Sequence, residues 1–342
     1  MWSLLLLAAC SSAVPESSAG SLHLRGARAP GGGALELFVD DGVLVDAVSA
    51  EMDVVEAEGA YVVPALFDAH VHLSYWSVDR ELRRAGVLTV VDLAAPIESL
   101  GAAWAVRVLG SGPMITAWQG YPTQSWGRDG YGLECVGAGA CAAAVDTVAD
   151  AGAVVIKVPL QGEPSLTREE LEAIVERAHA RGLPVAAHAL GEAEARLAAE
   201  VGADLLAHTP VEALSDETVA LWAEGAVVSS LMAFGNREAT RDNLGRLVAA
   251  GATVLYGTDL GNRRVAGLDA AELAAMQQAG LSAEQVLSSV TTAPATFFGQ
   301  PDRAGLSVGQ EGSFLLLDAD PLQDPSALAR PVAVYERGQR VQ

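Results

Sequence analysis

The sequence contains very little lysine. Lys157 is the single lysine in a chain of 342 residues, and every other basic side chain is an arginine. Positive charge is scarce altogether, because 21 basic residues face 43 acidic ones and the formal net charge is −22. This balance excludes a nucleic-acid partner, since binding to a phosphate backbone needs a basic face. The acidic excess fits either solvated helix faces or an acidic recognition surface.

Aromatic residues and long hydrophobic runs are also rare. Aromatics make up 5% of the chain, apolar residues 51%, and there are 35 glycines. Such a composition is typical of an α/β globular protein and excludes disordered and repeat classes. A chain of this length can bury a large core. No stretch is apolar for long enough to form a transmembrane helix.

The N-terminus carries a short apolar run that ends at Cys10. Residues 4–12 read L-L-L-L-A-A-C-S-S, which is too short for a permanent membrane span. The run is either an unremarkable apolar N-terminus or the core of a secretory signal. Its L-A-A-C resembles a bacterial lipobox, in which the cysteine is lipidated, although no basic residue precedes it. We therefore expect residues 1–20 to be a signal or lipoprotein tether. The protein would be exported, and either secreted or lipid-anchored at the periplasmic side of a bacterial cell envelope.

The two remaining cysteines lie close together. Cys135 and Cys141 stand in the glycine-rich stretch E-C-V-G-A-G-A-C, which we expect to be a loop. In an oxidising compartment such a pair is expected to form a disulfide that closes a small loop, and two free thiols are the alternative.

Short apolar segments alternate with amphipathic ones from about residue 64 to 299. We expect strands at 62–68, 87–93, 112–118, 153–158, 183–188, 203–208, 225–230 and 252–259. Eight strands alternating with helices predict a (β/α)₈ TIM barrel over residues 61–305. Residues 21–60 and 306–342 are β-rich at both ends of the chain. They are expected to pair into one small β-sandwich beside the barrel.

The unusual polar residues fall at the carboxyl ends of these strands, where barrel active sites are built. Two histidines at i and i+2 on a strand point to one face. The strand-end residues are His70, His72, Lys157, His188, His208 and Asp259. The seventh strand has no such residue, and His23 and His179 lie outside the pattern. Several histidines and one aspartate at one barrel end predict a metal site.

This arrangement resembles the amidohydrolase superfamily, and within it the imidazolonepropionase-related and Xaa-Pro dipeptidase-like branch with a carboxylated lysine. The segments T-T-A-P-A-T-F-F-G and G-L-S-V-G-Q-E-G-S-F-L-L-L-D-A-D-P-L support the resemblance. It implies a metal-dependent hydrolase that cleaves amide C–N bonds at a binuclear centre. His70, His72 and Asp259 would hold one metal ion, His188 and His208 the other, and a carboxylated Lys157 would bridge both.

The chemistry of lysine explains that role independently. An ammonium group in an apolar strand is poorly solvated, so its pKa falls and the neutral amine is populated. A neutral amine can add CO₂ and become a carbamate, whereas a guanidinium stays protonated. Two nearby metal ions can share a hydroxide and polarise a carbonyl oxygen. Asp259 is then the catalytic general base as well as a ligand.

Imidazole-rich ligands favour Zn²⁺, with Mn²⁺, Fe²⁺ and Co²⁺ as alternatives. We expect Asp68 to support the His-x-His strand without binding metal.

Substrate contacts are expected in the loop W-Q-G-Y-P-T-Q-S-W-G-R-D-G-Y-G, which resembles the superfamily's substrate loop. Tyr121, Trp126 and Arg128 are the candidates, and a purely structural packing loop is the alternative. The substrate expected is a small molecule or short peptide with a dipeptide-like or cyclic amide. The sequence does not determine whether the protein forms a homo-oligomer.

Three other interpretations remain. The enzyme could hold a single metal ion, although Lys157 argues against this. Lys157 could instead form a Schiff base, which leaves the histidines unexplained. The chain could also be a non-enzymatic lipoprotein that binds a metal or another ligand on a barrel scaffold.

Overall fold

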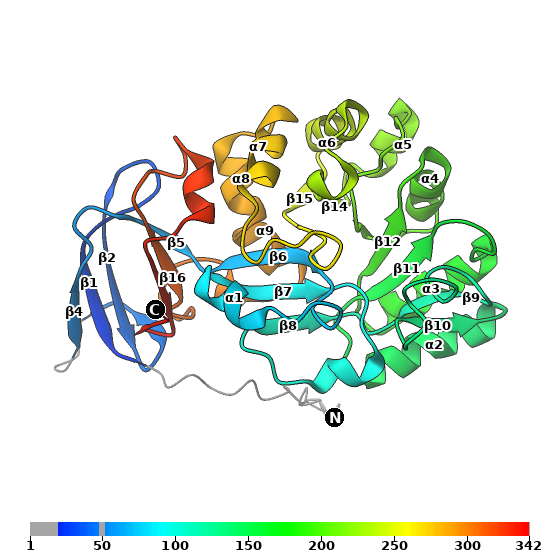
Figure 1. Ribbon diagram of the computed structural model, residues 1–342, viewed down its shortest axis with the longest axis horizontal. Helices are drawn as coiled ribbons and strands as arrows, with labels where there is room; N and C mark the ends of the chain where they lie inside the picture. The colour runs from blue at the N-terminus through cyan, green and yellow to red at the C-terminus, as the bar shows by residue number, and fades with distance from the viewer. Residues whose placement is uncertain (1–19, 48–51, 342) are drawn as a thin grey trace, which may run out of the picture.

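The computed structural model describes residues 20–47 and 52–341 (Figure 1). Cys10 and most of the predicted tether lie outside the described residues. Within the described part of the chain, none of the helices combines the length and the apolar character that a membrane crossing needs.

The central strands are parallel and form the barrel. The pairing runs from β6 to β8 on one side and from β11 to β15 on the other. Hydrogen bonds from Ala69 N to Tyr256 O (2.8 Å) and from Asp259 N to His70 O (2.9 Å) join β6 to the last of these strands. The bounds are β6 (Leu66–Val71), β7 (Val87–Asp92), β8 (Arg107–Gly110), β9 (Met114–Ala117), β10 (Gly132–Cys135), β11 (Ile156–Leu160), β12 (Val185–Ala189), β13 (Leu205–Leu206), β14 (Ala226–Val228) and β15 (Thr253–Leu255).

Two of the expected strands are divided, which corrects the sequence prediction. The segment 62–68 splits at Pro64 and Ala65 into β5 (Tyr61–Pro64) in the sheet of the chain ends and β6 in the barrel. The third strand begins earlier than expected, because β8 pairs with β7 and β9 pairs with β10. Gly112 has a φ of 66° and the next residue, Pro113, has no N–H, so the ladder is interrupted between β8 and β9.

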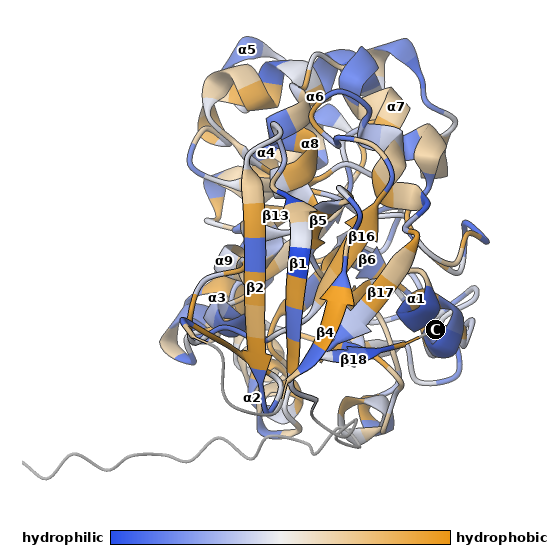
Figure 2. Ribbon diagram, turned by 90° about the vertical axis from the view of Figure 1, so that its left-hand side faces the viewer, coloured by the Kyte–Doolittle hydropathy of each residue, from blue (hydrophilic) through white to orange (hydrophobic). Residues whose placement is uncertain are grey.

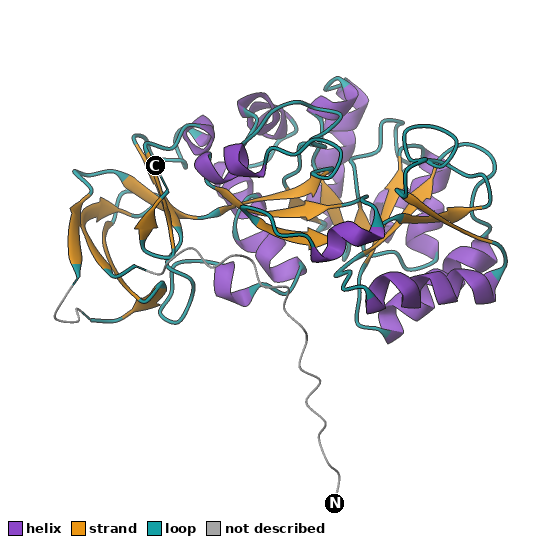
Figure 3. Ribbon diagram, turned by 60° about the horizontal axis from the view of Figure 1, so that its bottom comes forward, coloured by secondary structure: helices purple, strands orange, loops and turns teal. Residues whose placement is uncertain are grey.

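The helices lie around the barrel strands (Figure 3). Thr167 caps α3 with a complete capping box to Glu170, which explains where this helix begins. The bounds are α1 (Asp79–Arg84), α2 (Ala138–Asp150), α3 (Arg168–Ala180), α4 (Glu192–Glu200), α5 (Asp216–Leu221), α6 (Glu238–Ala250), α7 (Ala270–Gln278), α8 (Ala283–Ser289) and α9 (Thr292–Phe297), with 3₁₀ turns η1 (Ile97–Gly101), η2 (Met232–Phe234), η3 (Pro301–Arg303) and η4 (Pro325–Ala329).

Strands from both chain ends share one sheet, in which β16 (Phe314–Leu317) lies antiparallel to β5. The order is β18-β17-β16-β5-β1-β2-β3, with β4 beside β1. Figure 2 shows apolar and polar residues alternating along these strands, and residues such as Leu24, Val39 and Phe314 form a separate apolar core. The remaining bounds are β1 (Leu22–Arg28), β2 (Ala34–Asp40), β3 (Val43–Val45), β4 (Asp53–Glu56), β17 (Ala333–Glu336) and β18 (Gln339–Arg340).

Cys135 and Cys141 form a disulfide. The sequence suggested that both cysteines lie in one loop, and this is wrong: Cys135 ends β10 and Cys141 lies in the first turn of α2. The bond therefore joins a strand next to the barrel to the helix that follows it.

Candidate metal centre

The predicted ligand residues meet at one cavity of about 250 Å³ at the carboxyl ends of the barrel strands. His70 lies in β6 and His188 in β12, and His72 follows β6 directly, whereas His208 and Asp259 lie two and four residues beyond β13 and β15. Lys157 is the second residue of β11, which begins and ends later than the expected strand 153–158, so it is not at the carboxyl end of its strand as predicted. All are buried, with Lys157 only 1% and His188 6% exposed. The residues that line this cavity include His70, His72, Lys157, His188, His208 and Asp259.

His70, His72 and Asp259 form the tightest group. Their candidate ligand atoms all lie within 4.8 Å of one another. Asp259 Oδ1 is 3.1 Å from His72 Nε2 and 3.7 Å from His70 Nε2. His70 lies in β6 and His72 follows it directly, and the backbone of this stretch hydrogen-bonds to the segment after β15, through Asp259 N to His70 O and His72 N to Leu260 O, so the fold itself brings these residues together.

The hydrogen bonds of His70 define which nitrogen is available to a metal ion. Its Nδ1 lies 2.7 Å from the carbonyl oxygen of Ala207, which can only accept, so Nδ1 carries the proton. Nε2 then keeps its lone pair, and it is buried without a hydrogen-bond partner, as is Nζ of Lys157. Such buried orphan atoms are costly unless something binds them. Imidazole nitrogens and carboxylate oxygens are ligands for divalent transition metals, so these residues fit a metal centre.

Burial favours the neutral, metal-binding form of three of the imidazoles, those of His70, His188 and His208. Burial and the nearby Lys157 lower the pKa of His188 to about 3, and burial also holds the pKa values of His70 and His208 well below the usual range. Burial lowers the pKa of Lys157 to about 7, against an opposing effect of Asp259. A substantial fraction of Lys157 is therefore a neutral amine at neutral pH.

Asp259 is held as a carboxylate in a fixed position. Burial alone would raise its pKa, but the hydrogen bond from His72 and the nearby His70 and His208 keep the pKa well below its usual value. Asn262 Nδ2 donates to both carboxylate oxygens, at 3.1 and 3.0 Å. The backbone of Asp259 has a φ of 56°, and such left-handed residues are concentrated at functional sites.

His188 and His208 are engaged by other side chains. His188 Nε2 lies 2.5 Å from Oε1 of Gln161, and His208 Nδ1 lies 3.1 Å from the hydroxyl of Ser230. The two rings stand edge to face with centroids 4.9 Å apart. They are thus adjacent in the cavity, but outside the tight group formed by the other three residues.

Several residues around the centre were missed by sequence reasoning. Gln161, Ser230 and Asn262 each follow the end of a barrel strand, so the strand-end rule that found the histidines could have found them too. Asp68, which the sequence assigned to a supporting role, accepts hydrogen bonds from the backbone N–H groups of His70 and Thr258, both at 3.1 Å. It thereby fixes the His-x-His strand against the segment that leads to Asp259.

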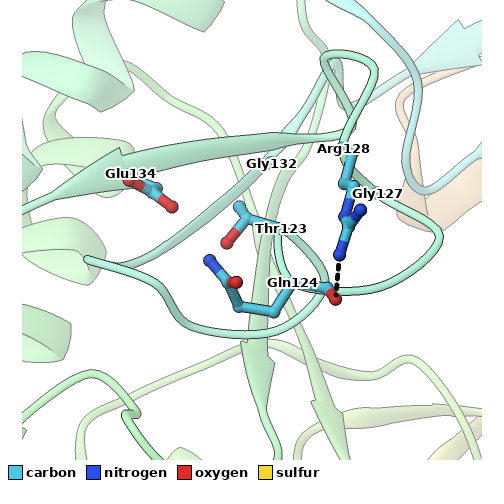
Figure 4. A pocket seen from close by; sticks show the side chains of 6 residues that line it. All are labelled: Thr123, Gln124, Gly127, Arg128, Gly132 and Glu134. Atoms are coloured by element: carbon cyan, nitrogen blue, oxygen red, sulfur yellow. Dashed lines mark hydrogen bonds between the residues drawn. The ribbon is translucent and has the colours of Figure 1, made fainter.

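The structure separates the three predicted substrate contacts. Tyr121 and Trp126 line the cavity with the histidines. Arg128 lines a second cavity of about 480 Å³ with Thr123, Gln124 and Glu134, and its guanidinium points to the carbonyl oxygen of Gln124 (Figure 4). A contact between Arg128 and a substrate stays a prediction, and it would require a substrate that reaches this second cavity.

A barrel with a buried histidine and carboxylate cluster at its strand ends is a scaffold for metal-dependent hydrolysis. Residues 61–341 match the model of the amidohydrolase family, and this chain belongs to that family. It is therefore a metal-dependent hydrolase that acts on carbon–nitrogen bonds.

Relatives at the sequence level carry no assigned activity. Uncharacterised proteins of Mycobacterium bovis and Mycobacterium tuberculosis are 27% identical to this chain, over 95% of its length and 96% of theirs.

Solved structures resemble the fold along nearly its whole length. A Xaa-Pro dipeptidase with bound methionine is similar with a TM-score of 0.79 and 19% identity, covering 94% of this chain and 99% of the other. Molinate hydrolase is similar with a TM-score of 0.77 and 17% identity, covering 95% of each chain. Ochratoxinase of A. niger has a TM-score of 0.73 and 19% identity, covering 95% of this chain and 96% of the other.

Proposed function

We propose that this protein hydrolyses an amide C–N bond at a binuclear metal centre. The observation that carries the proposal is the convergence of four histidines, Lys157 and Asp259 on one cavity of about 250 Å³. A single ion held by His70, His72 and Asp259 would leave Lys157 Nζ buried without a partner. A second ion gives this lysine a role, and this supports a binuclear centre.

The proposed ligand set divides between two ions. His70, His72 and Asp259 hold the first ion, and His188 and His208 hold the second. Zn²⁺ is the ion that the imidazole-rich set favours, with Mn²⁺, Fe²⁺ and Co²⁺ as alternatives. When bound, the ions supply an activated water and polarise the carbonyl oxygen of the substrate.

In this proposal Lys157, as a carbamate, would supply the carboxylate that both ions share. Its neutral Nζ, populated because burial lowers the pKa to about 7, attacks the carbon of CO₂ and loses one proton to form the N-carboxylate. The product is an anion with two oxygens on a long side chain. Arginine cannot replace it, because a guanidinium stays protonated.

Asp259 moves the proton. Its carboxylate accepts the proton of the attacking water and delivers it to the leaving nitrogen as the C–N bond breaks. Asn262 supports this role, because its amide donates to both carboxylate oxygens and limits their rotation.

Metal analysis and turnover test the proposal together. We expect purified, metal-loaded protein to contain about two divalent ions per chain and to hydrolyse members of a dipeptide and lactam library. One ion per chain with full activity in Lys157→Ala would support a mononuclear enzyme instead. Metal binding without turnover of any amide, ester or lactam would favour a binding protein, and borohydride trapping of a substrate on Lys157 would favour a Schiff base.

We also propose the division into a barrel (61–305) and an end module (21–60 with 306–342), preceded by a lipid tether at Cys10. Limited proteolysis tests the division. Membrane fractionation of the wild type against Cys10→Ser tests the tether, which predicts release of the variant from the membrane fraction.

A further inference from the structure

Two kinds of side chain line the cavity. The polar lining consists of the buried candidate metal ligands with the exposed Gln161 and Asn262. The apolar and aromatic lining, called the wall here, consists of the side chains of Met114, Tyr121, Trp126, Leu190, Ala233 and Phe234. A substrate whose scissile amide lies at the candidate metal ligands can place its substituents against this wall, where apolar and flat groups bury surface most favourably.

Tyr121 and Trp126 form a preorganised aromatic corner of this wall. The indole N–H of Trp126 donates to the Tyr121 hydroxyl at 2.8 Å, which ties the two side chains together. The ring of Tyr121 lies 5.6 Å from His188, and that of Trp126 lies 5.4 Å from His72. Because the Tyr121 oxygen accepts this hydrogen bond, its own hydrogen remains to donate to an acceptor in the cavity.

Among the described residues, Lys157 is the only lysine or arginine that lines the cavity, and it is committed to the metal centre. Of the arginines close in sequence to the lining residues, three lie against other groups, and Arg237, three residues beyond Phe234, is exposed and is not among the residues that line the cavity. Arg128 lines the second cavity, and Arg263 pairs with Asp269 at 2.6 Å. Arg264 lies over the ring of Trp76, 5.3 Å from its centroid.

This distribution bears on the charge of the substrate. In a dipeptide, the free carboxylate lies beyond the leaving nitrogen, and the atoms that bind the scissile carbonyl cannot also neutralise it. A carboxylate buried without a cationic partner is strongly disfavoured. We propose that the substrate is an uncharged amide with a flat, apolar substituent that packs against Tyr121 and Trp126, and not a dipeptide with a free carboxylate. This inference rests on the proposed amide hydrolysis.

A matched pair of ligands tests the inference through binding as well as turnover. 4-Acetamidobenzamide and 4-acetamidobenzoate have nearly the same shape and differ in one negative charge. With metal-loaded protein and isothermal titration calorimetry, we expect the benzamide to bind about 10- to 100-fold more tightly. Equal or tighter binding of the benzoate, or no binding of either compound, would overturn the inference. Preferential binding of the benzamide with no hydrolysis would leave the inference standing and count against the proposed hydrolysis of this class.

A designed change in the wall tests the cause of the preference. Ala233 lines the cavity and is partly exposed, so it can accept a longer side chain. Ala233→Arg adds a cation at the wall and should reverse or abolish the preference for the benzamide. Ala233→Met adds a similar length without charge and should keep the preference. If both variants keep it unchanged, the missing cation is not its cause.

Discussion

His70, His72 and Asp259 face one another with their candidate ligand atoms within 4.8 Å, whereas His188 and His208 each contact a polar neighbour. The first half of the proposed centre is held by the backbone, because His70 in β6 and His72 directly after it belong to one stretch that hydrogen-bonds to the segment that carries Asp259. The second half depends on single residues from separate strands, so its geometry is set by side chains.

This difference indicates that the two halves should respond differently to substitution. Asp259 belongs to the half that the fold preorganises, and removal of its carboxylate should weaken metal binding and lower turnover. In the proposed centre Lys157 would bridge the two halves, and the contact of Gln161 with His188 Nε2 would compete with a metal ion in the second half. Each of the following predictions tests one part of this comparison.

Asp259→Asn should have the largest effect. The amide keeps the shape of the carboxylate but cannot accept the proton of the attacking water, so we expect kcat to fall by about 10²- to 10⁴-fold. Steady-state kinetics at matched metal content measures the loss. Asp302→Asn is the control, because Asp302 pairs with Arg107 away from the cavity and should leave kcat near that of the wild type. Wild-type turnover in Asp259→Asn would refute the assigned role.

Lys157→Ala should remove the second metal ion while leaving the first. We expect the metal content to fall from about two ions per chain to about one, with loss of activity that short carboxylic acids partly restore. Lys157→Arg keeps the positive charge but cannot form a carbamate, so it should be as impaired as the alanine variant. Full activity in the arginine variant would show that a cation suffices at this position.

The barrel, and the convergence of the candidate ligands on one cavity, could be predicted from the sequence because both follow from local patterns. His70 and His72 share a face by the two-residue period of a strand, and Lys157 stood out by composition. The sequence could not place Arg128, because a residue in an irregular loop follows tertiary packing and not a period. It also misplaced the boundaries near Pro64 and Pro113, where a missing N–H lets the chain change its strand partner.

Because Lys157 is the single lysine, the change of its pKa on folding should be measurable in the pH dependence of the free energy of unfolding. Burial lowers the pKa of Lys157 from 10.5 to about 7. Between these values the unfolded chain binds a proton that the folded chain does not, so the free energy of unfolding should rise with pH across this window, by at most about 1.4 kcal/mol for each pH unit. Denaturant unfolding of metal-free protein in CO₂-free buffer tests this. Lys157→Met should lack the rise, and a variant with the same pH dependence as the wild type would contradict the assignment.

Gln161→Ala should have the smallest effect, and it tests the second half of the centre directly. Removing the contact to His188 Nε2 frees this nitrogen, so the second ion should bind about two- to tenfold more tightly, as expected for the loss of one competing hydrogen bond.

Ser230→Ala is the matched variant with the opposite expected effect on the affinity for the second ion. The Ser230 hydroxyl contacts Nδ1 of His208 and so orients the ring, and its removal should weaken the same ion by about tenfold or more. Competition with a chelator measures both affinities, and the first ion serves as the internal control because neither residue touches His70, His72 or Asp259 by hydrogen bond. Effects of the same sign in both variants would mean that Gln161 orients His188 in the way that Ser230 orients His208, and that the two halves differ less than the hydrogen bonds indicate.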